Sequence, residues 1–357
     1  MSLALTDLCR YPIVQAPMAG GVSCPQLVGA VAEAGGLGFL AAGYKTADGM
    51  YNEVKQLRGL TGQPFGVNLF MPQQALADPS AVEVYRHQLA GEAAWYETPL
   101  GDPDSSGDDG YEAKVAILLE DPVPVVSFTF GCPARDTLDA FAGVGTFTVV
   151  TVTSPQEARN AQWAGADAVC VQGVEAGGHQ STHHDDAQAG LTSTGLLSLV
   201  AQVRETVQLP IVAAGGLMRG SQIAAVLAAG ADAAQLGTAF LVCPESGAHL
   251  LHKQALTNPL FVTTALTRAF SGRPARGLAN RFVREHGPYA PAAYPQVHHL
   301  TSGLRKAAAK AGDAQGMALW AGQGHRMARE LPAGELVELL ATETDAAWAA
   351  VSGRGAQ

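Results

Sequence analysis

The feature that most constrains the fold of this chain is a succession of eight short apolar runs, most of them separated by amphipathic stretches. The runs are rich in Val, Ile and Ala and lack polar alternation, which is typical of parallel strands covered on both faces. They predict eight parallel strands. The runs are PIVQAPM from Pro12, GLGFLAA from Gly36, PFGVNLF from Pro64, VPVVSFTFG from Val123, TFTVVTV from Thr146, DAVCVQGV from Asp167, LPIVAAGG from Leu209 and DAAQLGTAFL from Asp232.

Helical stretches connect most of these runs, and one joint between helix and run is repeated. The phrase AGADA occurs at 164–168 and again at 229–233, each time directly before the rest of an apolar run. Ser154, Pro155 and Glu157 form a helix start, with a hydroxyl cap, a proline in the first turn and an acid soon after. Eight successive βα units in about 250 residues predict a (β/α)8 barrel. An open, doubly wound sheet is the alternative fold.

Two segments fall outside this repeat. Residues 74–122 are long for one crossover, and their polar stretch GDPDSSGDDG at 101–110 predicts a mobile loop. Residues 258–357 follow the eighth run, and neither segment shows a second core in its sequence. We therefore predict a barrel domain over 1–257 with a long insertion between strands 3 and 4. The C-terminal extension over 258–357 is expected to pack on the barrel and not to form an independent domain.

Composition excludes several classes of protein. The net charge of −10 would repel phosphate backbones, so we expect no nucleic-acid partner. No run of about 18 apolar residues occurs, so we expect no membrane span. The N-terminal MSLALTDLCRYP lacks the basic start and long apolar run of a signal peptide. The five cysteines are scattered and form no CxxC, which favours a reduced, cytoplasmic protein with buried thiols.

Glycines at the ends of the last two predicted strands indicate a phosphate site. In a (β/α)8 barrel the active site lies at the carboxyl ends of the strands. Gly215 and Gly216 end the seventh run, and Gly237 and Thr238 end the eighth. Backbone N–H groups at such ends can bind a phosphate, and glycine lets the phosphate oxygens approach closely. Ordinary left-handed turns are the structural alternative for these glycines.

Side-chain amides at three strand ends indicate a bound ring. Asn68, Gln172 and Gln235 would lie together at the barrel mouth, where donors and acceptors can match the edge of a heteroaromatic ring such as flavin. A structural role in loop hydrogen bonding is the alternative. His179 follows Gly177 and Gly178, which allow its loop to run close to a ligand, and imidazole suits proton transfer near neutral pH.

The histidines after the sixth run also resemble a metal site at first inspection. His179 and His183 have the i, i+4 spacing of a zinc-binding helix, and His184, Asp185 and Asp186 follow. That motif needs a helix with a glutamate after the first histidine, whereas Gln180 follows here and two glycines precede. We therefore expect no metal and interpret 183–186 as a solvated loop. A zinc hydrolase and a cofactor-free binding barrel remain as alternative functions.

Taken together, these residues resemble the nitronate monooxygenase family, formerly called 2-nitropropane dioxygenases, and specifically its bacterial class I type. The resemblance spans nearly the whole chain in the family's order. The phrases that carry it are QAPMAGGVS (15–23), GGLGFLAAG (35–43), PFGVNLF (64–70), VSFTFGCP (126–133), AGADAVCVQGVEAGGH (164–179), PIVAAGG (210–216), AAQLGTAFLVCPES (233–246), SGRPARGLANRF (271–282) and WAGQG (320–324).

The resemblance implies non-covalent FMN and oxidation of alkyl nitronates, such as propionate 3-nitronate, by O2. The products would be an aldehyde or oxo acid with nitrite or nitrate. It implies that His179 is the catalytic residue. An FMN-dependent NAD(P)H:quinone or enoyl-thioester reductase of the same superfamily is the alternative. The cofactor-binding residues that we predict are Met18, Asn68, Gln172, Gly177, Gly178, Gly215, Gly216, Gln235, Leu236, Gly237, Thr238 and Trp320.

Three positions depart from the pattern that the resemblance implies. Members of the family often carry a histidine where Thr129 stands. They often carry a tyrosine and a lysine where His298 and Ser302 stand. These positions shape the substrate pocket, so the departures concern the substrate rather than FMN. Loss of the lysine removes a positive charge expected for a nitronate that bears a carboxylate.

The basic phrase SGRPARG, residues 271–277, has two interpretations. Its arginines could contact a phosphate, but a salt-bridged structural loop is the interpretation that we favour. Cys132 and Cys243 follow strand ends without an evident activating partner, so both are expected to be buried thiols.

Overall fold

A computed structural model describes residues 5–73, 78–105, 109–185 and 194–354. Eight parallel strands close into a barrel, as the eight apolar runs predict. Val14 of the first strand pairs with Gln235 of the last, which completes the closure and excludes an open sheet. The barrel strands are β1 (Ile13–Gln15), β2 (Leu37–Ala41), β3 (Phe65–Phe70), β4 (Val125–Thr129), β5 (Phe147–Val152), β6 (Ala168–Gln172), β8 (Ile211–Ala214) and β9 (Ala233–Leu236).

The AGADA phrases form the same structural joint twice. Gly165 and Gly230 have φ of 103° and 105°, a left-handed conformation that ends each helix and that glycine adopts without a steric penalty. The Asp167 carboxylate then accepts a hydrogen bond from the Thr148 N–H, and the Asp232 carboxylate accepts one from the Ile211 N–H, both at 2.8 Å. Each aspartate therefore ties the start of its strand to the neighbouring strand.

Helices surround the barrel, and none of those in the described ranges is long and apolar enough to cross a membrane. The Ser154 side chain caps the helix that follows it by accepting from the Glu157 N–H, as its sequence predicts. The helices are α1 (Leu5–Leu8), α2 (Pro25–Glu33), α3 (Ala47–Arg58), α4 (Pro79–Gln88), α5 (Ala90–Trp95), α6 (Tyr111–Glu120), α7 (Arg135–Gly143), α8 (Pro155–Ala164), α9 (Leu196–Thr206), α10 (Gly220–Ala228), α11 (Leu250–Thr257), α12 (Arg281–His286), α13 (Gln296–Lys310) and α14 (Ala333–Arg354).

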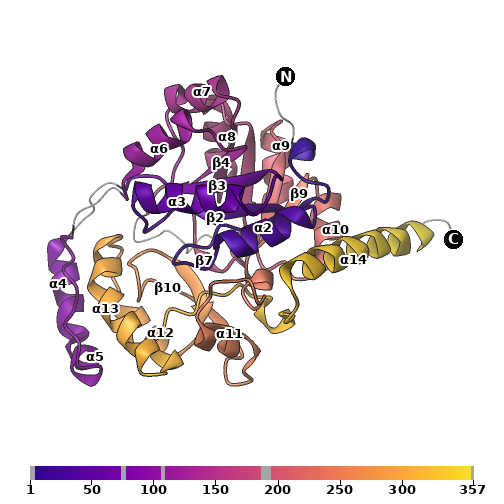
Figure 1. The fold of residues 1–357 in the computed structure, drawn as a ribbon. Coiled ribbons are helices and arrows are strands. Elements are labelled where there is room, and N and C mark those ends of the chain that lie inside the picture. The colour runs from indigo at the N-terminus through magenta and orange to yellow at the C-terminus, as the bar shows by residue number, and fades with distance from the viewer. Residues whose placement is uncertain (1–4, 74–77, 106–108, 186–193, 355–357) are drawn as a thin grey trace.

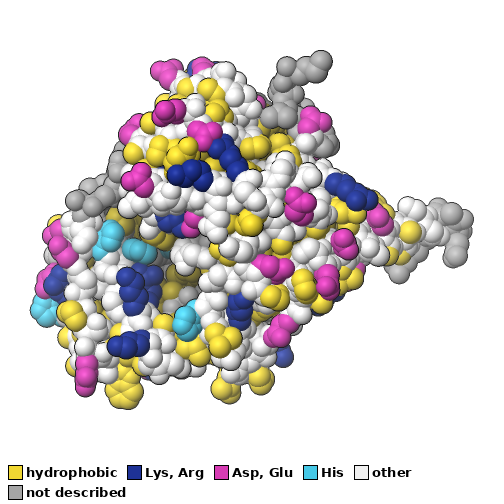
Figure 2. All heavy atoms as spheres, in the orientation of Figure 1, with side chains coloured by type: hydrophobic (Ala, Val, Ile, Leu, Met, Phe, Trp, Pro, Cys, Tyr) yellow, Lys and Arg dark blue, Asp and Glu magenta, His cyan; other side chains and the backbone are white. Residues whose placement is uncertain are grey.

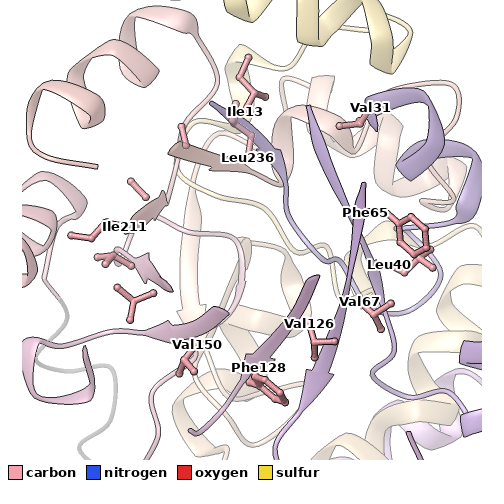
Figure 3. Close-up of a cluster of buried hydrophobic side chains, with 14 of the residues drawn as sticks. Ile13, Val31, Leu40, Phe65, Val67, Val126, Phe128, Val150, Ile211 and Leu236 are labelled. Atoms are coloured by element: carbon pink, nitrogen blue, oxygen red, sulfur yellow. The ribbon is translucent and has the colours of Figure 1, made fainter. Parts of the chain in front are cut away.

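The hydrophobic core has one layer inside the barrel and one around it. Phe39, Val149 and Val212 are among the side chains that fill the interior. The outer layer lies between strands and helices, where Figure 3 shows side chains such as Val67 and Leu236 pointing away from the barrel axis into a continuous apolar layer. Both faces of the strands are therefore buried, which explains why their sequences lack polar alternation.

The insertion and the C-terminal extension pack together beside the barrel. Figure 1 shows α4 and α5 next to α12 and α13, although about 200 residues separate them in the chain. A separate apolar cluster joins them, with Tyr85 and Leu89 from the insertion and Phe270, Phe282 and Leu300 from the extension. Each supplies only part of the cluster, so no single stretch of sequence shows it.

The rest of the extension contacts the barrel through a small sheet and a long helix. In the small sheet, β11 (Ala275–Leu278) is the middle strand and pairs with β10 (Thr264–Thr267) on one side and β7 (Gly178–His179) on the other. The strand β7 belongs to the loop after β6. The last helix, α14, packs along α10, where a Cβ on Gly220 would lie 2.3 Å from the Cβ of Glu343. The boundary at residues 257 and 258 stays a prediction.

Candidate active site

A cavity of about 380 Å³ lies at the carboxyl ends of the barrel strands, where the barrel fold places active sites. Elements of the extension form its other wall, and Figure 2 shows a hollow next to α13 with Lys, Arg and His side chains on its edge. Twelve of the thirteen site residues predicted from the sequence line it. They are Met18, Asn68, Gln172, Gly177, Gly178, His179, Gly215, Gly216, Gln235, Gly237, Thr238 and Trp320.

Leu236 is the predicted site residue that does not line the cavity. Its side chain is 1% exposed and lies in the outer apolar layer, as Figure 3 shows. Successive residues of a strand point to opposite faces. The neighbour Gln235 faces the cavity, and Leu236 therefore faces the helices. Its carbonyl accepts a hydrogen bond from the Ala16 N–H at 2.9 Å.

His179 is held in place by both its backbone and its ring. The residue pairs with Ala275 of β11, so strand pairing fixes its main chain. The ring Nε2 lies 2.8 Å from the Oγ of Ser271, which is itself 1% exposed. Of the two ring nitrogens of His179, only Nε2 has a hydrogen-bond partner among the described residues. Nδ1 is therefore the nitrogen available to a molecule in the cavity.

The electrostatic surroundings of His179 keep its ring neutral. Burial, with the positive charges of Arg273 and Arg305, lowers the pKa of His179 to about 3. A neutral imidazole has one N–H donor and one acceptor nitrogen. Its low pKa makes it a weak base, whereas a neutral N–H can still donate to anionic oxygens. The site therefore favours hydrogen bonding by His179 over storage of a proton on it.

Aromatic rings surround His179 on the cavity wall. The centroids of Phe130 and Tyr294 lie 5.8 Å from that of His179, and the centroid of Trp320 lies 5.4 Å away. Phe130 has a φ of 74°, a conformation that is rare for a bulky residue and is typical of constrained functional sites. The guanidinium of Arg273 stacks over the Phe130 ring at 4.1 Å and contributes to holding it there.

The three amides at the strand ends have different roles. The Gln172 Nε2 donates to the His179 carbonyl at 3.0 Å, and its Oε1 accepts from the Ser181 N–H at 2.7 Å. Gln172 therefore holds the loop that carries His179. For this amide, the structure agrees with the alternative interpretation, a role in loop hydrogen bonding. The Asn68 Nδ2 donates to Ser127 and Thr129, each at 2.9 Å to a hydroxyl.

Asn68 and Gln235 leave acceptor oxygens for a ligand. No donor to Asn68 Oδ1 occurs in the described part of the chain, and the same holds for Gln235 Oε1, whose amide nitrogen makes only a 3.4 Å contact to the sulfur of Cys170. Both residues line the cavity. The two carbonyl oxygens can therefore accept from the N–H edge of a heteroaromatic ring.

The glycine turns fit a phosphate. Gly216 has a φ of 65°, and the turns after β8 and β9 face the cavity. The N–H groups of Gly216, Gly237 and Thr238 find no protein acceptor within the described ranges. Three free N–H donors at neighbouring strand ends suit an anion, so the residues present fit a flavin with a phosphate at this end.

Gly177 serves a contact between loops as well as the cavity. A Cβ on Gly177 would lie 2.5 Å from the Gly322 nitrogen and 2.6 Å from the Ala321 carbonyl carbon. The Gly322 N–H also donates to the Thr238 Oγ1 at 2.9 Å. The WAGQG loop therefore packs directly on the loop before His179, and this packing brings Trp320 to the cavity.

Two of the residues that follow His179, His183 and Asp185, have structural partners. The His183 Nε2 lies 2.9 Å from the Thr151 carbonyl oxygen. The rings of His183 and His179 therefore have different hydrogen-bond partners, since the His179 Nε2 contacts the Ser271 hydroxyl. Asp185 is 8% exposed and pairs with Arg268 at 2.7 Å. The prediction of a solvated loop is therefore correct for His184, which is exposed, and wrong for Asp185. Asp186 lies outside the described residues.

The arginines of SGRPARG have a structural role, and they donate hydrogen bonds to carbonyl oxygens rather than pairing with carboxylates. Arg273 is fully buried and donates to the carbonyls of Gln180 and Thr182 and to the Gln73 amide oxygen. The Arg276 Nε donates to the Val174 carbonyl at 2.8 Å. Both arginines therefore tie the extension to the loop after β6. The prediction of a salt-bridged loop is correct about the structural role and wrong about the partners.

Sequence reasoning missed three residues of the site. Ser271 lies within SGRPARG, where only the arginines drew attention. Tyr294 belongs to the stretch rich in Pro and Tyr, and its ring lies 6.3 Å from the His298 ring. Arg305 lines the cavity from α13 and lies three residues after Ser302. The missing lysine at Ser302 was a signal to look for another cation on the same helix.

Comparisons with known proteins agree with this geometry. The nitronate monooxygenase family model matches residues 2–343. A nitronate monooxygenase from Pseudomonas aeruginosa is 42% identical over 94% of this chain and 96% of its own length. A nitroalkane oxidase structure from Streptomyces ansochromogenes is 73% identical, has a TM-score of 0.95 and covers 97% and 99% of the two chains. The structure of FabK from Thermotoga maritima is 28% identical over 98% of each chain, with a TM-score of 0.75.

Proposed function

Because the chain belongs to the nitronate monooxygenase family and is an oxidoreductase acting on nitronates, we propose that it uses FMN and O2. The substrates are alkyl nitronates of the propionate 3-nitronate type, and the products are an aldehyde or oxo acid with nitrite or nitrate. The observation that carries this proposal is the placement of neutral His179 at a strand-end cavity beside free amide and N–H groups.

The residues that would hold FMN fall into two groups. The N–H groups of Gly216, Gly237 and Thr238 would bind the phosphate. The oxygens of Asn68 and Gln235 would accept from the ring edge. Met18 and Trp320 would line the flavin, as would the backbone at the remaining predicted glycines, Gly177, Gly178 and Gly215. When bound, the flavin supplies the electron acceptor for the nitronate.

His179 would orient the substrate. Its neutral ring can donate a hydrogen bond to an oxygen of the nitronate, which already lacks its α-proton. With a neutral nitroalkane the ring would have to accept that proton, and its low pKa makes this step less favourable. Phe130, Tyr294 and Trp320 exclude water around the ring, which strengthens the hydrogen bond. We therefore propose that the nitronate anion is the preferred form of the substrate.

Replacement of the ring tests this role. The variant His179→Asn keeps a polar side chain of similar reach. It is expected to retain the flavin spectrum and to lower kcat/KM for a nitronate by about 100-fold, which corresponds to loss of one strong hydrogen bond to charge. His183→Asn is the matched control in the same loop and should leave kcat/KM nearly unchanged. Unchanged turnover by His179→Asn would refute the role of His179.

The likeness to FabK keeps a reductase as the second candidate function. Anaerobic mixing of the purified protein with NADH separates the two. Rapid loss of the flavin absorbance would favour an NAD(P)H-dependent reductase. Stable absorbance, together with nitronate-dependent O2 uptake in air, would favour the monooxygenase.

A further inference from the structure

A guanidinium on the cavity wall lacks an acidic partner. Arg305 lines the cavity, and no carboxylate pairs with it in the described part of the chain. Its Nη2 donates to the His298 carbonyl at 2.9 Å and lies 3.4 Å from the His298 Nδ1. Its Nε is buried and has no acceptor among the residues that the structure describes. By contrast, Arg268 and Arg281 each pair with a carboxylate.

The charge of Arg305 persists despite its surroundings. Burial lowers the pKa of Arg305, and its facing titratable groups are the hydroxyls of Tyr44 and Tyr294 rather than acids. An arginine nevertheless stays protonated in a protein. Arg305 is half-buried, and a charge partly removed from water without a counter-charge is costly and is normally paired. The cavity therefore presents a positive site that an anionic ligand would satisfy.

Arg305 lies near the position on α13 where the resemblance implies a lysine. The resemblance places a lysine at Ser302, whose hydroxyl instead donates to the His299 carbonyl at 3.0 Å. Arg305 lies one helical turn further along α13, and residues three apart share a helix face. The cation expected at Ser302 is thus replaced by one displaced by a turn on the same helix.

Aromatic rings separate Arg305 from His179. The Tyr294 centroid lies 5.8 Å from that of His179 and 6.3 Å from that of His298, whose ring in turn neighbours the guanidinium. The cavity therefore has two polar ends. The His179 end suits the nitronate group, and the Arg305 end suits a second anionic group on the same molecule.

We propose that Arg305 determines specificity by binding a carboxylate at the end of the substrate remote from the nitronate carbon. This inference rests on the proposed function, because it names the part of a nitronate substrate that the site recognises. The planar guanidinium can donate two parallel hydrogen bonds to a carboxylate, and its Nη1 makes no hydrogen bond to any of the described residues.

Turnover of two nitronates tests the inference. Propionate 3-nitronate carries the carboxylate, and propyl 1-nitronate has the same chain length with a methyl group in its place. For Arg305→Gln, kcat/KM should fall about 10- to 100-fold for propionate 3-nitronate and less than about 3-fold for propyl 1-nitronate. Arg305→Lys should keep most of the preference. Lys306→Gln removes the same charge from the exposed neighbour and should change neither value.

Equilibrium binding gives a second readout that does not depend on turnover. Succinate has a planar anionic group at each end, with the spacing of propionate 3-nitronate, and butyrate lacks one of them. Calorimetry should show that wild-type protein binds succinate more tightly than butyrate, and that Arg305→Gln removes the difference while Lys306→Gln keeps it. Flavin content and Tm report whether each variant is folded.

The outcomes separate this inference from the proposed function. Equal losses on both nitronates in Arg305→Gln, or an unchanged preference for succinate, would overturn the role of Arg305 and leave nitronate oxidation standing. If wild-type protein oxidises neither nitronate, the proposed function fails, and the succinate titration still decides whether Arg305 binds a carboxylate.

Discussion

The contact between Ser271 and His179 permits a quantitative prediction about a positioning residue. Ser271 lies 92 residues from His179 in the chain, yet its Oγ is 2.8 Å from the Nε2 of the ring. The variant Ser271→Ala removes this partner and leaves a buried ring nitrogen without a hydrogen bond. Ser271 is 1% exposed, so water does not readily replace the hydroxyl.

The size of the effect follows from that burial. A buried polar group left without its partner costs about 1–3 kcal/mol. If the loss appears in the orientation of the ring in the transition state, it corresponds to a decrease of about 5- to 150-fold in kcat. The decrease should appear in kcat at saturating nitronate with unchanged flavin content, because Ser271 does not line the cavity.

The assay compares Ser271→Ala with a variant of similar burial. The Thr301 hydroxyl is buried and donates to the Phe270 carbonyl at 2.5 Å, away from His179. Thr301→Val should lose comparable stability, measured by Tm, without loss of kcat. Ser271→Thr keeps the hydroxyl and should restore part of the activity. The reasoning is refuted if Ser271→Ala retains wild-type kcat, or if Thr301→Val loses as much kcat.

Two further predictions concern pH and the loop contact. Burial lowers the pKa values of His179, His252 and His298 to about 3, about 4 and about 2, below the unfolded value near 6.5. At pH values between the folded and unfolded pKa of each histidine, the unfolded state binds more protons than the folded state. The free energy of unfolding is therefore highest above pH 6.5, and at pH 5 it is lower by about 2 kcal/mol per histidine. Urea titrations that show equal stability at pH 5 and pH 7.5 would contradict this. Gly177→Ala places a Cβ 2.5 Å from the Gly322 nitrogen and should lower Tm and flavin retention. Gly91→Ala lies inside α5 with no atom within 4 Å of the added Cβ, so it should lower neither.

The strand ends show how much of the site could be predicted from local sequence. Parallel strands in a closed barrel bring their carboxyl ends to one edge, so Asn68, Gln235 and Gly216 had to meet once eight strands were recognised. His179 was predicted for the same reason, because it follows the sixth strand. Leu236 was misplaced because alternation along β9 turns it to the outer layer.

Contacts between distant segments were beyond local sequence. The apolar cluster of Tyr85 with Phe270 depends on the insertion meeting the extension, and the local sequence of either segment does not show that they meet. Gln172 and Gln235 both end a strand. Only the tertiary structure shows that the Gln172 amide already makes its hydrogen bonds with the loop around His179.

The sequence by itself determined the barrel, the edge at which the cavity lies and the position of His179 at that edge, since periodicity, glycine turns and strand order are local properties of the chain. Tertiary structure decided what His179 and Arg305 contact. The Ser271 hydroxyl and the rings of Tyr294 and His298 reach the site only when the extension closes over the barrel. Hydrogen bonds and burial depend on that closure. They set the neutral state of His179 and leave Arg305 without a carboxylate partner among the described residues.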